Sequence, residues 1–124
     1  MAKIMIVDDS RFMRKMLSDI LTEEGHKIVG EAENAKEATE LYSRLKPDLL
    51  TLDIVMPEVE GENAFSALKT IVSEDPKARV IVVSALGQEQ VIKECMEAGA
   101  KSFIPKPFQS ENVARVVRTV LASG

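Results

Sequence analysis

Residues 3–9 read Lys-Ile-Met-Ile-Val-Asp-Asp, a short apolar run that ends abruptly in two carboxylates. The apolar part, Ile4 to Val7, lacks the polar–apolar alternation of a half-exposed strand. Such a continuous run is typical of a strand that is buried on both faces. Strands of this kind occur in parallel sheets covered by helices on both sides, so this stretch indicates an α/β fold.

Outward from this stretch, the chain alternates between short β-branched runs and segments of helical periodicity. The predicted strands are Lys3–Val7, Lys27–Glu31, Leu49–Leu52, Val80–Val83 and Ser102–Ile104. The first helical segment has apolar residues spaced as one helix face, namely Phe12, Met13, Met16, Leu17, Ile20 and Leu21. Five strands that alternate with five helices predict right-handed βαβ connections and a doubly wound (βα)5 parallel sheet.

The composition indicates one globular domain over residues 1–124, with 45% apolar and 29% charged residues. Sixteen Lys and Arg against twenty Asp and Glu give a net charge of −4, which argues against a nucleic-acid-binding domain. No apolar run approaches the ~18 residues that a membrane span needs, so membrane insertion is not expected. The single cysteine, Cys95, excludes an internal disulfide and fits a reducing cytoplasm.

Polar residues follow four of the five predicted strands. Asp8 and Asp9 come after the first strand, Asp53 after the third, Ser84 after the fourth and Lys106 after the fifth. Open α/β sheets bind their ligands at the carboxyl ends of the strands. We therefore expect these side chains to gather at one edge of the sheet.

Three carboxylates at one place repel each other, and at least one pKa should rise unless a cation binds. Their hard oxygen atoms select Mg²⁺, Mn²⁺ or Ca²⁺ over Zn²⁺, and an open crevice favours Mg²⁺. With Lys106 as a fixed positive charge and Ser84 as a hydroxyl donor, the set suits phosphoryl transfer. Asp53 is the expected nucleophile, which would form an aspartyl phosphate, while Asp8 and Asp9 would hold the metal or its waters.

These motifs, taken in order, resemble the receiver domain of two-component response regulators. The resemblance rests on Asp8-Asp9, on Asp53 followed by Met56-Pro57 and Gly61, on Ser84-Ala85 and on Lys106-Pro107. Residues 8–14 and 84–88 resemble the receivers of chemotaxis in particular. The resemblance implies a flavodoxin-like strand order of 2-1-3-4-5 and one receiver domain over residues 1–124 with no output domain.

The resemblance also implies a metal and a phosphate donor. A histidine kinase of the chemotaxis type would transfer a phosphoryl group to Asp53, with Mg²⁺ required. Asp9 and Asp53 would bind the metal through their side chains and Val55 through its backbone carbonyl. Asp8 would act mainly through metal-bound water.

A switch is the third implication of the resemblance. Ser84 and Lys106 would contact the phosphoryl oxygens, and Phe103 would rotate inward as Ser84 moves. The surface of the fourth helix, fifth strand and fifth helix would then bind a motor or adaptor protein. Such a protein is a switch and not an enzyme, apart from its own phospho-acceptance and autodephosphorylation.

Two positions beside the expected pocket depart from the family pattern. Val55 and Leu86 are apolar where polar residues are common, so neither can orient an attacking water. We therefore expect slow self-dephosphorylation, which leaves room for a partner phosphatase. The resemblance also implies a cis peptide bond before Pro107.

Three other functions remain open from the sequence. A receiver could pass its phosphoryl group to a histidine phosphotransfer protein as a phosphorelay intermediate. A phosphatase of the haloacid dehalogenase type also uses an aspartate nucleophile, but it needs a second Asp where this chain has Val55. A flavin-binding module needs a phosphate loop after the first strand, where Asp8 and Asp9 would repel phosphate.

Overall fold

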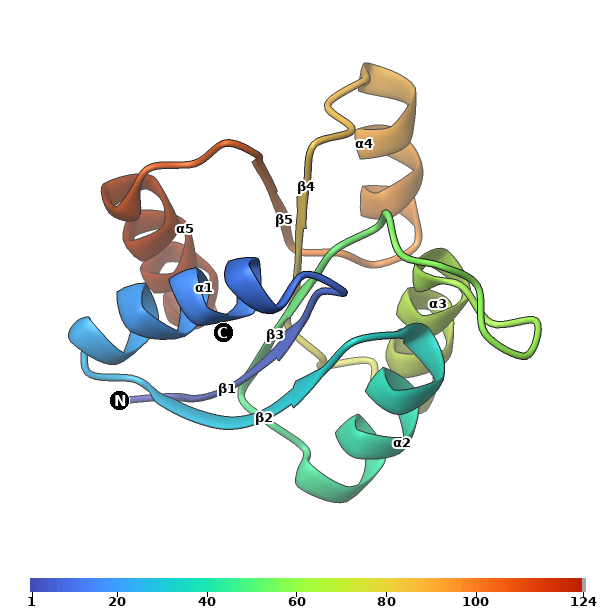
Figure 1. The fold of residues 1–124 in the computed structure, drawn as a ribbon, viewed down its shortest axis with the longest axis horizontal. Coiled ribbons are helices and arrows are strands. Elements are labelled where there is room, and N and C mark those ends of the chain that lie inside the picture. Colours follow the sequence, from blue (N-terminus) through green and yellow to red (C-terminus); the bar gives the residue numbers. More distant parts are fainter. Residues whose placement is uncertain (124) are drawn as a thin grey trace.

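The structure, a computed structural model that describes residues 1–123, is a five-stranded parallel sheet between two layers of helices (Figure 1). The strands are β1 (Lys3–Val7), β2 (Lys27–Ala32), β3 (Leu49–Leu52), β4 (Val80–Ser84) and β5 (Ser102–Pro105). The helices are α1 (Arg11–Glu23), α2 (Ala35–Leu45), α3 (Ala64–Glu74), α4 (Glu89–Glu97) and α5 (Ser110–Ala122). The strand order, β2-β1-β3-β4-β5, confirms the predicted order.

The helices divide between the two faces of the sheet. Helices α1 and α5 cover one face, and α2, α3 and α4 cover the other (Figure 1). Successive residues of a strand point to opposite faces, so Ile4 and Ile6 enter the core beneath α1 and α5 while Met5 and Val7 enter the other core. Burial on both faces explains why the central strands are apolar without interruption.

The helix ends follow local chemistry. Ser10 caps α1, because its hydroxyl oxygen accepts a hydrogen bond from the Met13 amide at 3.2 Å. Asn63 and Ser66 form a reciprocal capping box at the start of α3. Beyond the ends of α1 and α4, Gly25 and Gly99 have φ values of +93° and +113°, a conformation that favours glycine.

One residue of the predicted apolar face of α1 lies outside the core. The side chain of Phe12 is 70% exposed, whereas Leu17 and Leu21 are buried. Phe12 lies five residues before Leu17 and nine before Leu21. At 3.6 residues per turn, these separations place Phe12 on nearly the opposite side of the helix. The periodicity therefore predicted the helix correctly but included one residue too many in its buried face.

The predicted strands are confirmed, and β2, β4 and β5 each extend one residue further at the carboxyl end. In the extended part, Ser84 of β4 pairs with Pro105 of β5. The Lys106 amide then donates a hydrogen bond to the Ser84 carbonyl at 2.9 Å. Because all five strands are parallel, their carboxyl ends bring the polar residues that follow them to one edge.

Candidate functional site

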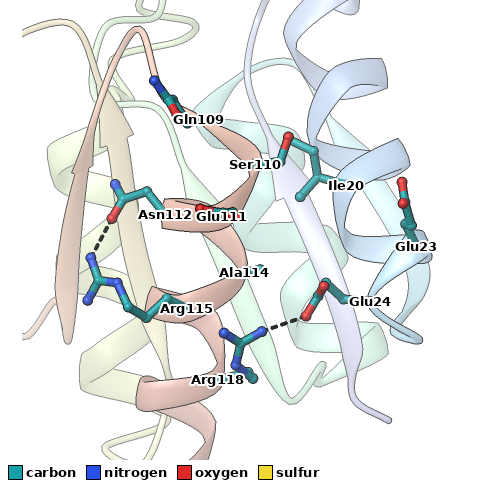
Figure 2. A pocket seen from close by; sticks show the side chains of 10 residues that line it. All are labelled: Ile20, Glu23, Glu24, Gln109, Ser110, Glu111, Asn112, Ala114, Arg115 and Arg118. Carbon is teal, nitrogen blue, oxygen red and sulfur yellow. Dashed lines mark hydrogen bonds and ion pairs between the residues drawn. The ribbon is translucent and has the colours of Figure 1, made fainter.

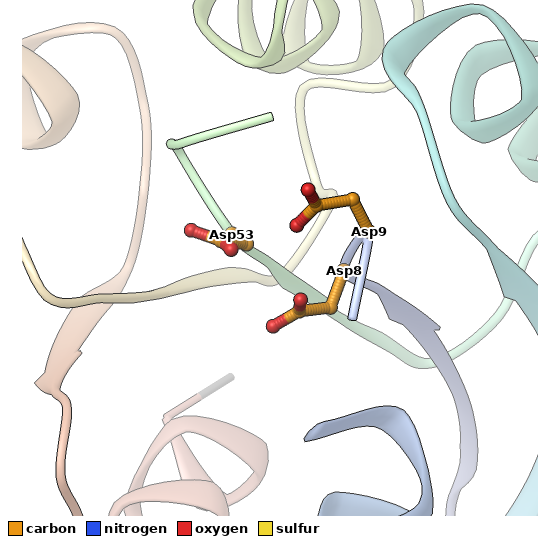
Figure 3. Close-up of side chains that lie close together, drawn as sticks. All are labelled: Asp8, Asp9 and Asp53. Carbon is orange, nitrogen blue, oxygen red and sulfur yellow. The ribbon is translucent and has the colours of Figure 1, made fainter. Parts of the chain in front are cut away.

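Three carboxylates converge at the carboxyl edge of the sheet. One carboxylate oxygen from each of Asp8, Asp9 and Asp53 lies within 4.8 Å of the others (Figure 3). Asp8 and Asp9 follow β1, and Asp53 follows the neighbouring β3. The Asp53 amide donates a hydrogen bond to the Val7 carbonyl at 2.9 Å, which ties the two strand ends together. The predicted acidic cluster is therefore present.

The three carboxylates differ in their access to solvent. The residue exposures of Asp8 and Asp53 are 1% and 5%, whereas Asp9 is exposed. The cluster thus has two buried acids and one acid that reaches solvent.

Lys106 joins the cluster from the loop after β5. Its ammonium lies 2.8 Å from Asp8 Oδ2 and 3.2 Å from Asp53 Oδ2. Burial alone would lower the pKa of Lys106, but the hydrogen bonds and charges of the two carboxylates outweigh it and raise that pKa. Lys106 therefore stays charged and partly neutralises the two buried acids. The peptide bond between Lys106 and Pro107 is cis, as expected.

The charge of the buried Asp53 carboxylate is only partly compensated. Burial raises the pKa of the Asp53 carboxyl above its usual value, and the nearby Asp8 charge adds to this effect. The Val55 amide, which donates to Asp53 Oδ1 at 2.9 Å, and the Lys106 ammonium act in the opposite direction. A cation bound beside Asp53 would relieve the remaining cost.

The other predicted site residues lie around this cluster. Ser84 is fully buried, and its hydroxyl oxygen accepts a hydrogen bond from the Leu86 amide at 3.2 Å. Val55 is 49% exposed beside Asp53. Phe103 of β5 is half-buried and packs against the core on the α2–α3–α4 face. Val55 thus lies two residues beyond Asp53, Ser84 is the last residue of β4, and Phe103 lies within β5, three residues before Lys106.

The donor set fits a divalent cation with a preference for oxygen ligands. Asp8, Asp9 and Asp53 offer three carboxylates in ligand-sharing proximity. Neither Cys95, buried in α4, nor His26, beside β2, belongs to this group. Hard oxygen donors that leave much of the coordination sphere to water suit Mg²⁺ better than Zn²⁺.

Sequence reasoning missed the role of Arg14 in this region. Arg14 lies in α1, yet its Nη1 donates to the Asp8 carbonyl at 2.6 Å and its Nε pairs with Glu31 of β2 at 3.0 Å. A side chain in α1 thus reaches both the loop after β1 and the next strand. The sequence offered only a weak signal, a basic residue five and six positions after the two acids.

A separate groove of about 710 Å³ lies between α1 and α5 (Figure 2). Across it, Arg118 of α5 pairs with Glu24 at the end of α1 at 2.7 Å. None of the residues that line this groove belongs to the acidic cluster.

Within residues 1–123, no helix has the length and apolar character that crossing a bilayer requires.

Comparison with known proteins places the chain in a family. Residues 4–118 match the response regulator receiver domain. The chain belongs to this family. It is 48% identical to the chemotaxis protein CheY of Thermotoga maritima over 118 residues, which cover 95% of this chain and 96% of that protein. It is 46% identical to the CheY of Bacillus subtilis over 119 residues, which cover 96% and 97%.

A solved structure is similar over nearly the whole chain. The crystal structure of a CheX–CheY–BeF₃–Mg²⁺ complex from Borrelia burgdorferi matches with a TM-score of 0.92 and 40% identity, over 98% of this chain and 90% of that chain. The chain is therefore a receiver of the CheY type, a response regulator of two-component signalling in chemotaxis. Because residues 4–118 match the receiver family, the haloacid dehalogenase and flavin-binding alternatives are not supported.

Proposed function

We propose that this receiver accepts a phosphoryl group on Asp53 from a histidine kinase, with Mg²⁺ bound beside it, and thereby changes its affinity for a target protein. The observation that carries the proposal is the convergence of Asp8, Asp9 and Asp53 with the Lys106 ammonium. Phosphorylation adds negative charge to a cluster that is already acidic. An acceptor carboxylate there therefore needs positive charge beside it, from Lys106 and a bound cation.

In the proposed transfer, a carboxylate oxygen of Asp53 attacks the phosphorus of a phosphohistidine. The new O–P bond forms as the P–N bond breaks, and the imidazole leaves with the electron pair of that bond. Asp9 and Asp53, with the Val55 carbonyl, would hold the metal, and Asp8 would act through a metal-bound water. Bound Mg²⁺ would offset charge on the phosphoryl oxygens.

Lys106 and Ser84 would report the new phosphate to the rest of the molecule. Lys106 now contacts two carboxylates, and it would exchange one of these contacts for a phosphoryl oxygen. Ser84 would give up its hydrogen bond to the Leu86 amide to reach the phosphate, which would move the loop after β4. Phe103 would pack more deeply in response, which alters the surface formed by α4, β5 and α5.

The partners proposed for this chain follow from the same scheme. A chemotaxis-type histidine kinase would be the donor, and a motor or adaptor protein would bind the altered α4–β5–α5 surface. The solved complex of CheX with a similar receiver supports a CheX-like protein as a further partner, and a phosphatase stays the further partner expected from the apolar Val55 and Leu86. A phosphorelay role is the alternative, in which a histidine phosphotransfer protein takes the phosphoryl group from Asp53.

Labelling tests the acceptor. The protein with Mg²⁺ and a phosphorylated histidine kinase, or acetyl phosphate, should gain one acid-stable, base-labile phosphoryl group. Asp53→Asn should abolish the label, whereas the control Asp19→Asn, which removes an exposed carboxylate of α1, should leave it unchanged. Persistent labelling of Asp53→Asn at the parent level contradicts the assignment.

A pull-down with and without beryllofluoride tests the output. This ligand imitates an acyl phosphate and should increase recovery of a motor or adaptor protein from a cell extract. Lys106→Arg should still accept phosphate but lose this increase. Recovery of a histidine phosphotransfer protein instead would favour the phosphorelay alternative.

Phosphate lifetime tests the role of the apolar residues beside the pocket. Val55 is exposed next to Asp53 and has no polar group with which to orient water. Val55→Asn should therefore accelerate loss of the phosphoryl group, which can be followed by phosphate release. An unchanged decay rate removes this explanation for slow self-dephosphorylation.

A further inference from the structure

The Arg14 side chain occupies a buried place between three segments. It is only 14% exposed, although it belongs to a helix whose other charged residues face solvent. Its guanidinium links α1 to the loop after β1, through the Asp8 carbonyl, and to β2, through Glu31. A cation held this far from solvent by two specific acceptors has a positional role that simple solubility does not explain.

The contact with the Asp8 carbonyl completes the restraint of residue 8. Its amide donates to the Ala32 carbonyl at 3.1 Å, and its carboxylate accepts a hydrogen bond from the Ser10 amide at 2.9 Å. The Lys106 ammonium holds the other carboxylate oxygen at 2.8 Å, and Arg14 adds the restraint at the carbonyl, at 2.6 Å. That carbonyl belongs to the planar peptide unit that joins Asp8 to Asp9. Fixing it therefore also fixes the position of the Asp9 Cα atom, from which the side chain starts.

Asp9 depends on this indirect restraint. Among residues 1–123, no hydrogen bond or ion pair with another side chain fixes the Asp9 carboxylate, in contrast to Asp8 and Asp53, which both contact Lys106. The position of Asp9 relative to the other two acids is thus set through the backbone. Arg14 controls the peptide unit immediately before it.

We propose that Arg14 is a positioning residue for the divalent-cation site, and that it acts by locking the Asp8–Asp9 peptide while Glu31 neutralises its charge. The inference rests on the proposed binding of Mg²⁺ at this cluster. Glu31 pairs with Nε of the same guanidinium at 3.0 Å, so Arg14 donates a hydrogen bond to the Asp8 carbonyl without adding an uncompensated positive charge beside the cluster.

The sign of the effect on metal affinity separates positioning from plain electrostatics. Loss of a positive charge near a cation site should strengthen cation binding. Loss of a positioning residue should weaken it, and outer-shell partners of metal ligands typically contribute about 10–100-fold to affinity. Arg14→Gln removes both the charge and the clamp, so the two explanations predict opposite changes.

Lys15→Gln is the matched control. Lys15 is the next residue of α1 and is 73% exposed, and within residues 1–123 its ion-pair partner is Asp19 on the same helix. The control therefore removes the same charge from the same helix without touching the loop. Calorimetric titration with Mg²⁺ should show binding about tenfold weaker for Arg14→Gln and binding equal to or slightly tighter than the parent for Lys15→Gln.

A second variant and a metal-free readout keep the test decisive. Arg14→Lys retains the charge, but a single ammonium cannot reproduce the planar fork that reaches both acceptors, so it should also weaken Mg²⁺ binding. In metal-free protein, the Ser10 amide should exchange its hydrogen faster in both Arg14 variants than in Lys15→Gln. This measurement needs neither metal nor phosphate.

The outcomes are distinguishable from those of the proposed function. If both Arg14 variants are folded and bind Mg²⁺ as tightly as the parent, the positioning role is wrong. Unchanged exchange at Ser10 in both variants also overturns it. If the parent shows no Mg²⁺ binding, the proposed function fails, whereas faster exchange at Ser10 still supports the Arg14 clamp.

Discussion

At the scale of single residues, the Lys106 ammonium supplies positive charge to the acidic cluster. Its ammonium bridges Asp8 and Asp53, so the metal-free site already contains one compensating charge. Mg²⁺ entering the cluster must share those carboxylates with the ammonium. Lysine and metal therefore compete in part for the same oxygen atoms.

Replacing Lys106 by methionine should consequently tighten Mg²⁺ binding by about tenfold, since the attraction of the carboxylates is no longer shared. Calorimetry at pH 8 and fixed ionic strength measures the change. Lys101→Met is the control, because this exposed lysine lies before β5 at the other end of the strand. Weaker or equal Mg²⁺ binding in Lys106→Met would contradict competition.

Thr51 shows a different property at the residue scale. It lies in β3, two residues before Asp53, and its buried hydroxyl has no hydrogen-bond partner in the part of the chain that the structure describes. Burial of an unpaired hydroxyl costs free energy. Thr51→Val has nearly the same shape without that group, and it should increase the free energy of unfolding by about 1 kcal/mol.

Urea unfolding of Thr51→Val and the parent tests this value. A companion substitution, Thr70→Val, changes an exposed threonine of α3 and should not stabilise the protein. Destabilisation by Thr51→Val would show that the hydroxyl has a partner in solution, such as an ordered water.

At the scale of elements, the glycines that follow α1 and α4 contribute to the fold in different ways. Gly25 after α1 and Gly99 after α4 both adopt positive φ values, +93° and +113°. A Cβ atom at position 25 would meet nothing within 4 Å, whereas one at position 99 would lie 2.7 Å from Val72 Cγ1 of α3. Gly99 therefore serves both the turn after α4 and the close approach of that turn to α3.

Alanine substitutions should separate these two roles. Gly25→Ala pays only for backbone strain and should lower the free energy of unfolding by about 1 kcal/mol. Gly99→Ala adds overpacking and should lower it by about 2–3 kcal/mol. Equal losses for the two variants in urea unfolding would show that Val72 moves aside without cost.

At the scale of the whole molecule, the buried carboxylate of Asp53 lowers the free energy of unfolding when it is ionised. The folded pKa of Asp53 is raised, mainly by burial, above its usual value of 3.8. The folded state therefore binds a proton at Asp53 more readily than the unfolded chain does. An ionised Asp53 consequently destabilises the fold above its folded pKa, and this cost is relieved as the pH falls through that pKa toward 3.8.

Asp53→Asn should therefore stabilise the metal-free protein at pH 7 by about 1 kcal/mol, in exchange for loss of function. Its advantage over the parent should shrink as the pH is lowered toward 3.8. Urea midpoints at several pH values measure both effects. A constant difference at all pH values would exclude the ionisation of Asp53 as its cause, and saturating Mg²⁺ should stabilise the parent more than the variant.

The sequence predicted much of the architecture because its signals are local. An apolar run such as Ile4 to Val7 predicts a buried strand without knowledge of its neighbours. Phe12 was placed wrongly because a helical pattern defines a face only to within about a residue. The strand order came from family resemblance, since no local pattern states which strands pair.

By itself, the sequence determined the alternation of strands and helices and which residue types follow each strand, because backbone preference and burial act over a few neighbouring residues. Only the tertiary structure decided that Lys106 bridges Asp8 and Asp53, and that Arg14 reaches the carbonyl of residue 8. The partners of Lys106 lie 98 and 53 positions away along the chain. Contacts over such separations exist only once the parallel sheet has aligned its strand ends.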